Sequence, residues 1–155
     1  MHIVAKETIT ELRKQMKAHN IDAYMIVTDD FHGSEYVGDY FKCRAYMSGF
    51  TGSAGTLVVT QDMAGLWTDG RYFLQAGEQL AGSGIDLFKM GEPGVPTVHA
   101  FLVDKLKEGQ TLGFDGRTVN AKEAFALKRD LEEKGAGVVY EQDLVDLVWK
   151  DRPAL

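Results

Sequence analysis

Apolar residues near the amino terminus recur at the spacing of one helical face. The positions that make this stripe are Ile9, Leu12 and Met16. Steps of three and four residues are typical of an amphipathic helix, and charged residues occupy positions around the stripe. Thr8 and Glu11 have the spacing of a capping box, and Asn20 is a residue type that ends helices in a left-handed conformation. The pattern predicts a helix that is capped near Thr8 and stops at Asn20.

Short apolar runs then alternate with helical patterns. The runs predicted to form strands cover residues 23–27, 56–60, 64–68, 85–88, 111–114 and 137–140. The helical patterns cover residues 71–80, 98–106, 121–134 and 144–149. The short link at 61–63 favours a hairpin between the second and third runs. This alternation predicts an α/β fold, with a mixed sheet flanked by helices.

An irregular segment, residues 28–51, interrupts the alternation. Aspartates and glycines punctuate it, and aromatic residues are spread along it. A long irregular segment inside a compact domain is usually functional or interfacial. We therefore expect this segment to carry chemistry or a contact surface.

Length and charge narrow the function classes. The 155 residues suit one domain, and 17 Lys and Arg against 23 Asp and Glu give a net charge of -6. Nucleic-acid binding rests on clustered cations, so an acidic chain with dispersed basic residues argues against a nucleic-acid partner. The single cysteine, Cys43, allows no internal disulfide. Neither a signal peptide nor a membrane-spanning run is visible, so we expect a cytoplasmic protein with no membrane partner.

Glycines at three-residue spacing, Gly49, Gly52 and Gly55, weakly resemble a phosphate-binding loop. Such a loop needs a strand before it and a helix after it, whereas a strand-like run follows here. Ser53 lacks the glycine two positions earlier that a nucleophile elbow requires, because Thr51 occupies that position. The sequence therefore favours a tight turn over a nucleotide or nucleophile site.

A metal site is a further option in the irregular segment. Asp29, Asp30, His32 and Glu35 are all ligand types and lie within a few residues of one another. Hydrolytic metal sites usually gather ligands from several elements, and structural zinc sites use cysteines or paired histidines. Compact acidic turns are also common without a metal. The favoured interpretation is hydrogen bonding that shapes the loop, with an intrinsic metal site as the alternative.

The segment 67–73 is the other cluster of interest. Asp69 and Arg71 stand two apart at a strand-to-helix turn, where a carboxylate can orient a guanidinium. The guanidinium fork would then be available to bind a carboxylate or a carbonyl. The alternative is a structural turn with an internal ion pair. The candidates in this cluster for substrate or interface contact are Trp67, Asp69, Arg71 and Tyr72.

Three motifs occur in order along the chain. They are Asp-Phe-His-Gly-Ser-Glu-Tyr at 30–36, Ser-Gly-Phe-Thr-Gly-Ser-Ala-Gly at 48–55 and Trp-Thr-Asp-Gly-Arg-Tyr-Phe at 67–73. With the closing segment 144–153, they make the chain resemble the first domain of the three-domain Xaa-Pro aminopeptidases, in the creatinase/prolidase superfamily. The resemblance spans nearly the whole chain. It implies a creatinase-type amino-terminal domain, a mixed sheet flanked by helices that is similar to ribonuclease H in outline.

The resemblance also implies where the chemistry of such a metalloprotease lies. In this family a separate catalytic domain with a pita-bread fold binds two divalent ions, usually manganese, through two Asp, one His and two Glu. A bridging hydroxide attacks the peptide bond before proline. Residues 1–155 match only the amino-terminal domain, with 144–155 as the exit segment toward a second domain. We therefore expect this chain to hold no metal cofactor and no catalytic residue, and to be inactive alone.

The same resemblance implies roles for the domain. Creatinase-type amino-terminal domains help to form oligomers and to wall the catalytic cleft. We therefore expect a homodimer whose other partners are its own catalytic domain and a proline-containing peptide. Arg71 and His32 are the leading candidates for groups that face the cleft or an interface. The further candidates are Asp69, Tyr72 and Trp67.

Two alternatives stay open. The chain could be a standalone scaffold that docks a partner through the aromatic-rich segment 36–50, or its parent could be a prolidase or creatinase relative. A reading frame that continues into a domain with the metal ligands would favour the peptidase, whereas a natural stop at Leu155 would favour the scaffold. The three motifs favour the three-domain aminopeptidases over the other relatives.

Overall fold

The computed structural model describes residues 2–27, 55–68, 73–80, 84–114 and 121–140. Six strands in this part of the chain form one sheet in the order β4-β3-β2-β1-β5-β6. They are β1 (Ala23–Val27), β2 (Thr56–Thr60), β3 (Ala64–Thr68), β4 (Asp86–Lys89), β5 (Thr111–Phe114) and β6 (Gly137–Val139). Strand β2 runs antiparallel to β1 and β3, whereas β1 with β5, β3 with β4 and β5 with β6 are parallel pairs. The sheet is therefore mixed, as the sequence predicts.

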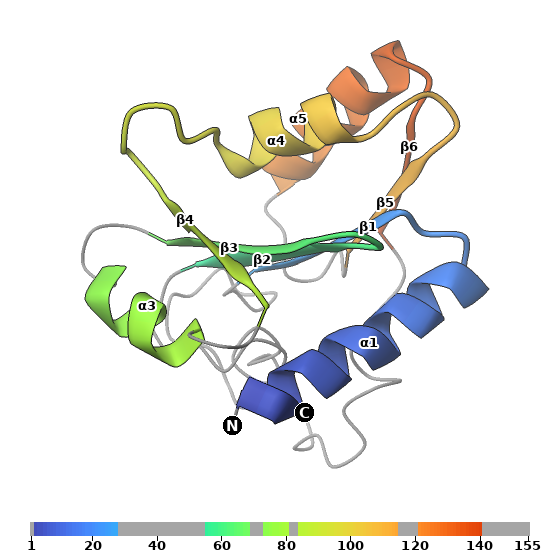
Figure 1. Ribbon diagram of the computed structural model, residues 1–155. Helices are drawn as coiled ribbons and strands as arrows, with labels where there is room; N and C mark the ends of the chain where they lie inside the picture. The colour runs from blue at the N-terminus through green and yellow to red at the C-terminus, as the bar shows by residue number, and fades with distance from the viewer. Residues whose placement is uncertain (1, 28–54, 69–72, 81–83, 115–120, 141–155) are drawn as a thin grey trace.

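Helices cover both faces of the sheet. They are α1 (His2–Ala18), α3 (Phe73–Leu80), α4 (Val98–Lys105) and α5 (Ala121–Glu133). In Figure 1, α1 and α3 lie below the sheet, and α4 and α5 lie above it. Alternate residues of β1 enter two separate cores, Tyr24 and Ile26 on the side of α1, Ala23 and Met25 on the side of α4 and α5. This arrangement confirms the predicted α/β class.

Most predicted element boundaries are confirmed. Strands β1, β2, β3 and β5 begin and end where the apolar runs do, whereas β4 is shifted by one residue and β6 is one residue shorter. Asn20 has a φ of 59°, and the Ile21 N–H donates to the Met16 carbonyl at 2.8 Å. These are features of a left-handed helix end, so the predicted stop is confirmed. The helix predicted at 144–149 lies outside the described residues.

The capping box predicted at Thr8 is wrong. Helix α1 begins at His2, so Thr8 lies inside the helix, where its side chain is buried. Residues 2–7 contain neither proline nor glycine, so nothing in them stops the helix from starting earlier. Capping-box spacing therefore does not mark a start when the preceding residues can themselves be helical.

Three aromatic rings join β3, β4 and α4. The rings of Trp67 and Phe88 are stacked, with centroids 4.0 Å apart and planes at 10°. Phe101 meets both of them edge-on. Gly65 makes room for this stack, because a Cβ there would come within 2.6 Å of the Phe88 ring. Such pairs contribute about 0.5–1.5 kcal/mol each beyond the area that they bury.

A charged cluster links α4 to α5. His99 Nε2 on α4 lies 2.6 Å from Asp130 Oδ2 on α5, and Arg129 Nε donates to Asp130 Oδ1 at 3.0 Å. The hydrogen bond from Arg129, followed by that from His99, lowers the pKa of Asp130 below its ordinary 3.8. The resulting stabilisation is present above that ordinary pKa and is lost as the pH falls through the lowered value of the folded state.

Gly65→Ala should lower the free energy of unfolding by about 1–3 kcal/mol, because the added methyl group must displace Phe88 or Trp67. Gly77→Ala is the matched control, since a Cβ at Gly77 in α3 meets nothing within 4 Å. Alanine there should stabilise the helix by about 0.5–1 kcal/mol. Urea unfolding measures both changes. An unchanged free energy for Gly65→Ala would contradict the close approach of the aromatic rings to Gly65.

Asp130→Asn should lower the melting temperature at about pH 7, and this deficit should shrink at an acid pH well below the ordinary 3.8 of an aspartate, where the wild-type carboxylate loses its charge. Asp104→Asn, which removes an exposed carboxylate on α4, serves as the control and should change little at either pH. Circular dichroism followed through thermal unfolding gives both values. A deficit of equal size at both pH values would contradict an electrostatic role for Asp130.

Candidate functional site

Three strand ends lie in one row across the sheet. Val27, the last residue of β1, is opposite Thr56, the first residue of β2, and Thr56 is opposite Trp67 of β3. We call this row the motif edge, because segment 28–54 joins Val27 to the residue before Thr56 and segment 69–72 follows the end of β3. The motifs at 30–36, 48–55 and 67–73 are thus all attached to one edge of the sheet. Ligand sites in α/β sheets commonly form where strand ends bring loops together in this way.

Most of the predicted site residues lie outside the described residues. These are His32, Asp69, Arg71 and Tyr72. The strand ends that flank their segments lie at the motif edge, and the structure describes none of the contacts of these four residues. Their roles in a cleft or an interface therefore stay predictions.

Trp67 is the one predicted site residue that the structure describes, and its side chain is in the core. It is 0% exposed and stacks on Phe88. Its Nε1 donates to the Pro96 carbonyl at 2.9 Å, so the loop before α4 is held against β3. Trp67 therefore packs within this domain, and any effect that it has on Asp69 and Arg71 passes through the end of β3.

The predicted metal alternative also lies outside the described residues. Its candidates are Asp29, Asp30, His32 and Glu35, and the single cysteine, Cys43, is in the same segment. Across the ranges that the structure describes, no group of three or more His, Cys, Asp or Glu is placed to hold a metal ion. In those same ranges no helix has the length and apolar character to cross a bilayer.

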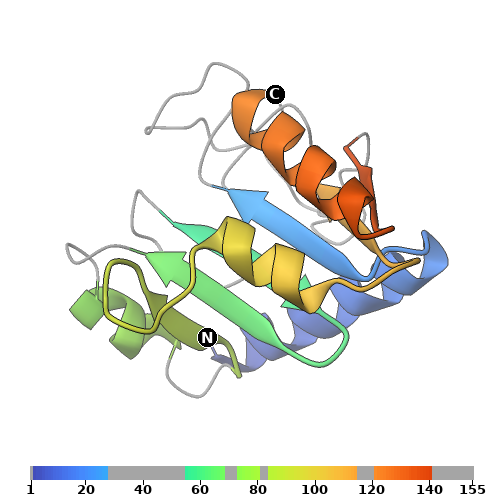
Figure 2. The same ribbon diagram turned by 90° about the horizontal axis from the view of Figure 1, so that it is seen from above.

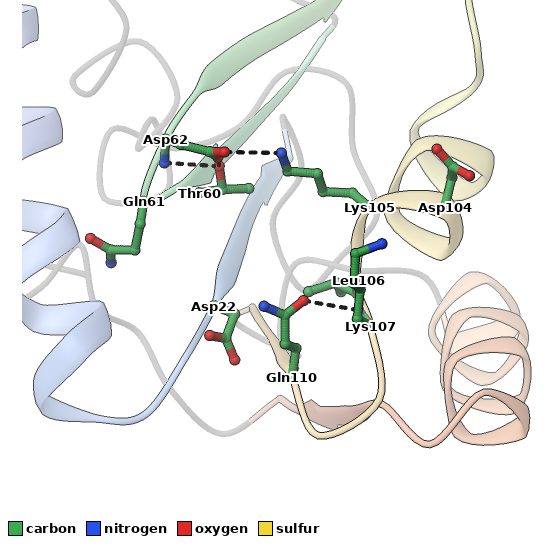
Figure 3. Close-up of a pocket in the computed structure, with 9 residues that line it drawn as sticks. All are labelled: Asp22, Thr60, Gln61, Asp62, Asp104, Lys105, Leu106, Lys107 and Gln110. Carbon is green, nitrogen blue, oxygen red and sulfur yellow. Dashed lines mark hydrogen bonds and ion pairs between the residues drawn. The ribbon is translucent and has the colours of Figure 1, made fainter.

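A pocket lies at the opposite edge of the sheet. Its volume is about 580 Å³, and it opens between the β2–β3 hairpin, the start of β1 and the segment that joins α4 to β5 (Figure 3). The residues that line it are Asp22, Thr60, Gln61, Asp62, Asp104, Lys105, Leu106, Lys107 and Gln110. Its size is in the range of small-molecule sites, and Leu106 is the one apolar residue among the described residues that line it.

Most polar groups of the pocket are already bound to each other. Lys105 Nζ lies 3.2 Å from Asp62 Oδ2, and Thr60 Oγ1 donates to Asp62 Oδ1 at 2.6 Å. The hydrogen bond from Thr60, followed by that from Lys105, lowers the pKa of Asp62. Asp62 is therefore ionised at neutral pH and is unsuited to act as a general acid.

The remaining contacts of the pocket fix the chain around it. Asp22 Oδ2 accepts the Thr111 N–H at 2.8 Å, and Gln110 Oε1 accepts the Lys107 N–H at 2.9 Å. Figure 3 shows Asp22 and Gln110 on the side of the pocket away from the Asp62–Lys105 pair. The pocket therefore consists mainly of interactions that hold turns in place, and it contains no pairing of a nucleophile with a base.

Sequence reasoning did not single out this pocket. Its polar residues come from separate segments: the α1–β1 turn, the β2–β3 hairpin, and the end of α4 with the segment that follows it. Only the strand order brings these segments together. The one local signal was the Gln61-Asp62-Met63 link, which predicts the hairpin but not a cavity beside it.

Comparison with known proteins identifies the family. The creatinase/prolidase N-terminal domain family matches residues 9–146. Aminopeptidase P2 from Arabidopsis thaliana is 45% identical over 153 residues, which is 96% of this chain and 21% of that protein. Probable Xaa-Pro aminopeptidase P from Pyricularia oryzae is 42% identical, over 95% of this chain and 24% of that protein. The chain thus spans 21–24% of the length of these curated relatives.

Solved structures agree with the sequence match. The X-prolyl aminopeptidase of Caenorhabditis elegans, a cytosolic enzyme with a di-nuclear active site, has a TM-score of 0.90 at 37% identity, over 97% of this chain and 26% of that one. The N-terminal domain of the cytoplasmic peptidase PepQ from Mycobacterium tuberculosis has a TM-score of 0.64 at 28% identity, over 92% of this chain and 98% of that one. The motif resemblance is thereby confirmed: this chain belongs to the creatinase/prolidase N-terminal domain family.

Proposed function

We propose that this chain serves as the non-catalytic amino-terminal domain of a metal-dependent Xaa-Pro aminopeptidase, an enzyme that hydrolyses the peptide bond before proline. The observation that carries the proposal is the match to Aminopeptidase P2, which covers 96% of this chain but only 21% of that protein. A domain that accounts for so small a share of its relatives leaves most of their length for the reaction.

The domain's contribution would be enclosure of the catalytic cleft. The motif edge supports this role, because the segments that carry His32 and Arg71 are anchored at neighbouring strand ends. A rigid sheet can then present both segments together to a peptide held by the rest of the enzyme. Arg71 would bind a carboxylate or a carbonyl of the peptide or of a neighbouring domain.

No step of the reaction is assigned to the described residues. The metal ions that the family resemblance implies, two and usually manganese, would belong to the rest of the enzyme. Assembly as a homodimer and a cytoplasmic location complete the proposal. The cytosolic X-prolyl aminopeptidase of Caenorhabditis elegans, at 37% identity, supports the location.

Arg71→Ala in the longer polypeptide that carries this domain should lower kcat/KM for an Xaa-Pro peptide by about 10- to 100-fold, the loss expected for one charge-assisted hydrogen bond. Its bound metal, measured by elemental analysis, should stay the same. Lys107→Ala is the matched control, because it removes an exposed cation at the opposite edge of the sheet. Unchanged kinetics for Arg71→Ala would remove Arg71 from the site.

The isolated chain should not hydrolyse a short Xaa-Pro peptide, with or without added manganese, because the reacting groups would lie in other domains. The assay follows release of the amino-terminal residue across fractions of the final purification column. Manganese-dependent turnover that rises and falls with the protein would contradict the proposal. Asp29, His32 and Glu35 would then be the first residues to replace.

A further inference from the structure

Three exposed apolar side chains lie at the β6 end of the sheet, one on β6, one on the residue that follows it and one on α5. Val139 is 37% exposed, Tyr140 is 50% exposed, and Phe125 on α5 is 74% exposed. Tyr140 stacks against Phe114 of the neighbouring strand, with ring centroids 6.5 Å apart, so its ring lies on the face that α4 and α5 cover. We call Phe125, Val139, Tyr140 and the outer edge of β6 the β6 surface.

Helix geometry turns Phe125 away from α4, onto the exposed side of α5. Asp130 contacts His99 of α4, so the Asp130 flank of α5 faces α4. Five residues separate Phe125 from Asp130, which at about 100° per residue turns Phe125 by about 140° from that flank. Phe125 therefore lies on the flank away from α4, and Figure 2 shows β6 on that side of α5.

Phe125 and Tyr140 also lie at similar distances from the turn that joins α5 to β6. Phe125 is eight residues before Glu133, the end of α5, which is about 12 Å of helix. Tyr140 is three residues beyond Gly137, the start of β6, which is about 10 Å of strand. The turn between α5 and β6 joins the end of the helix to the start of the strand, so the two elements are antiparallel. Phe125 and Tyr140 are therefore displaced from this turn in the same direction, toward the motif edge.

The side of β6 away from β5 carries backbone groups that can form hydrogen bonds with another segment. Among the described strands, β6 has a neighbour on one side only. The Gly137 N–H donates to the Gln110 carbonyl at 2.8 Å, toward β5. Successive N–H groups of a strand point to alternate sides, so the N–H groups of Val138 and Tyr140 point away from β5.

The two outermost strands of the sheet, β4 and β6, differ in charge. Strand β4 carries Asp86 and Lys89, and both are exposed. Charged residues of this kind keep an outermost strand from pairing with a strand of another molecule. Residues 137–140 carry no charge. An uncharged edge strand beside exposed aromatic rings is suited to burial against another protein surface.

We infer that the β6 surface docks the domain that follows in the longer polypeptide, through an apolar patch and a backbone segment of that domain. The inference rests on the proposed function. Tyr140, in this surface, is the last residue that the structure describes, and residues 141–155 continue directly from it. A following domain would therefore be tethered to the β6 surface through residues 141–155, which raises its effective concentration there.

The size of the β6 surface favours this occupant over a second copy of the chain. A stable dimer of separate molecules buries about 1,200–2,000 Å² in total, which is more than three partly exposed side chains and a short strand supply. Interfaces between domains of one chain are often smaller, about 600–1,500 Å². The net charge of -6 further opposes self-association.

Hydrogen exchange resolved to single amides tests the inference. The amides of Val138 and Tyr140 should exchange at least tenfold more slowly in the longer polypeptide than in the isolated chain. The Gly137 amide, bonded to Gln110 in both forms, is the internal control. Equal exchange rates at Val138 and Tyr140 in the two forms would overturn the inference.

Phe125→Glu in the longer polypeptide should remove that protection. Leu74→Glu is the matched control, since Leu74 on α3 is 78% exposed but lies far along the sheet from β6. Equal effects of the two substitutions would overturn the inference. A dimer of the isolated chain in sedimentation, dissociated by Phe125→Glu, would make a second copy the occupant instead.

Peptide hydrolysis by the longer polypeptide separates this inference from the proposed function. An active enzyme whose Val138 and Tyr140 amides are unprotected would overturn the docking inference alone. A polypeptide with protected amides that does not cleave Xaa-Pro peptides would support docking and overturn the aminopeptidase function.

Discussion

The pairing of β1 on both of its edges is the constraint on which the rest of the domain depends. β1 joins an antiparallel partner, β2, to a parallel partner, β5, and its alternate side chains fill two separate cores. A slip of one residue would exchange Tyr24 and Met25 between those cores and would break the register on both sides. The positions of both halves of the sheet therefore follow from this one strand.

The entry into β1 is held by a close contact between helix and sheet. The left-handed Asn20 turns the chain so that Ile21 packs over β5, where a Cβ at Gly113 would come within 2.8 Å of the Ile21 side chain. Asp22 then exchanges two hydrogen bonds with Thr111, one through its N–H and one through its carboxylate. The end of α1, the start of β1 and the start of β5 are thus one unit, and this unit forms one wall of the pocket.

Sequence patterns predicted the elements well because each strand is short, apolar and bounded by turn residues. They could not predict the strand order, since pairing depends on which buried faces match, and the pocket residues meet only through that order. The sequence prediction started α1 near Thr8 because Thr8 and Glu11 have capping-box spacing, whereas the helix begins at His2. Among the site candidates, Trp67 lies within a distinctive motif, yet its ring is buried and stacked on Phe88. A motif alone therefore does not separate residues that pack in the core from residues that contact a ligand.

The direction of the strands divides the domain into two ends with different tasks. All strands except β2 point their carboxyl ends to the motif edge. At the opposite edge the links that the structure describes in full, such as the hairpin at 61–63, are short, and polar contacts such as Lys105 with Asp62 hold that hairpin. The β6 surface also reaches the motif edge through Tyr140. A domain that docks there would be positioned directly relative to the segments that carry His32 and Arg71, so one edge of the sheet would set both the domain contact and the wall of the cleft.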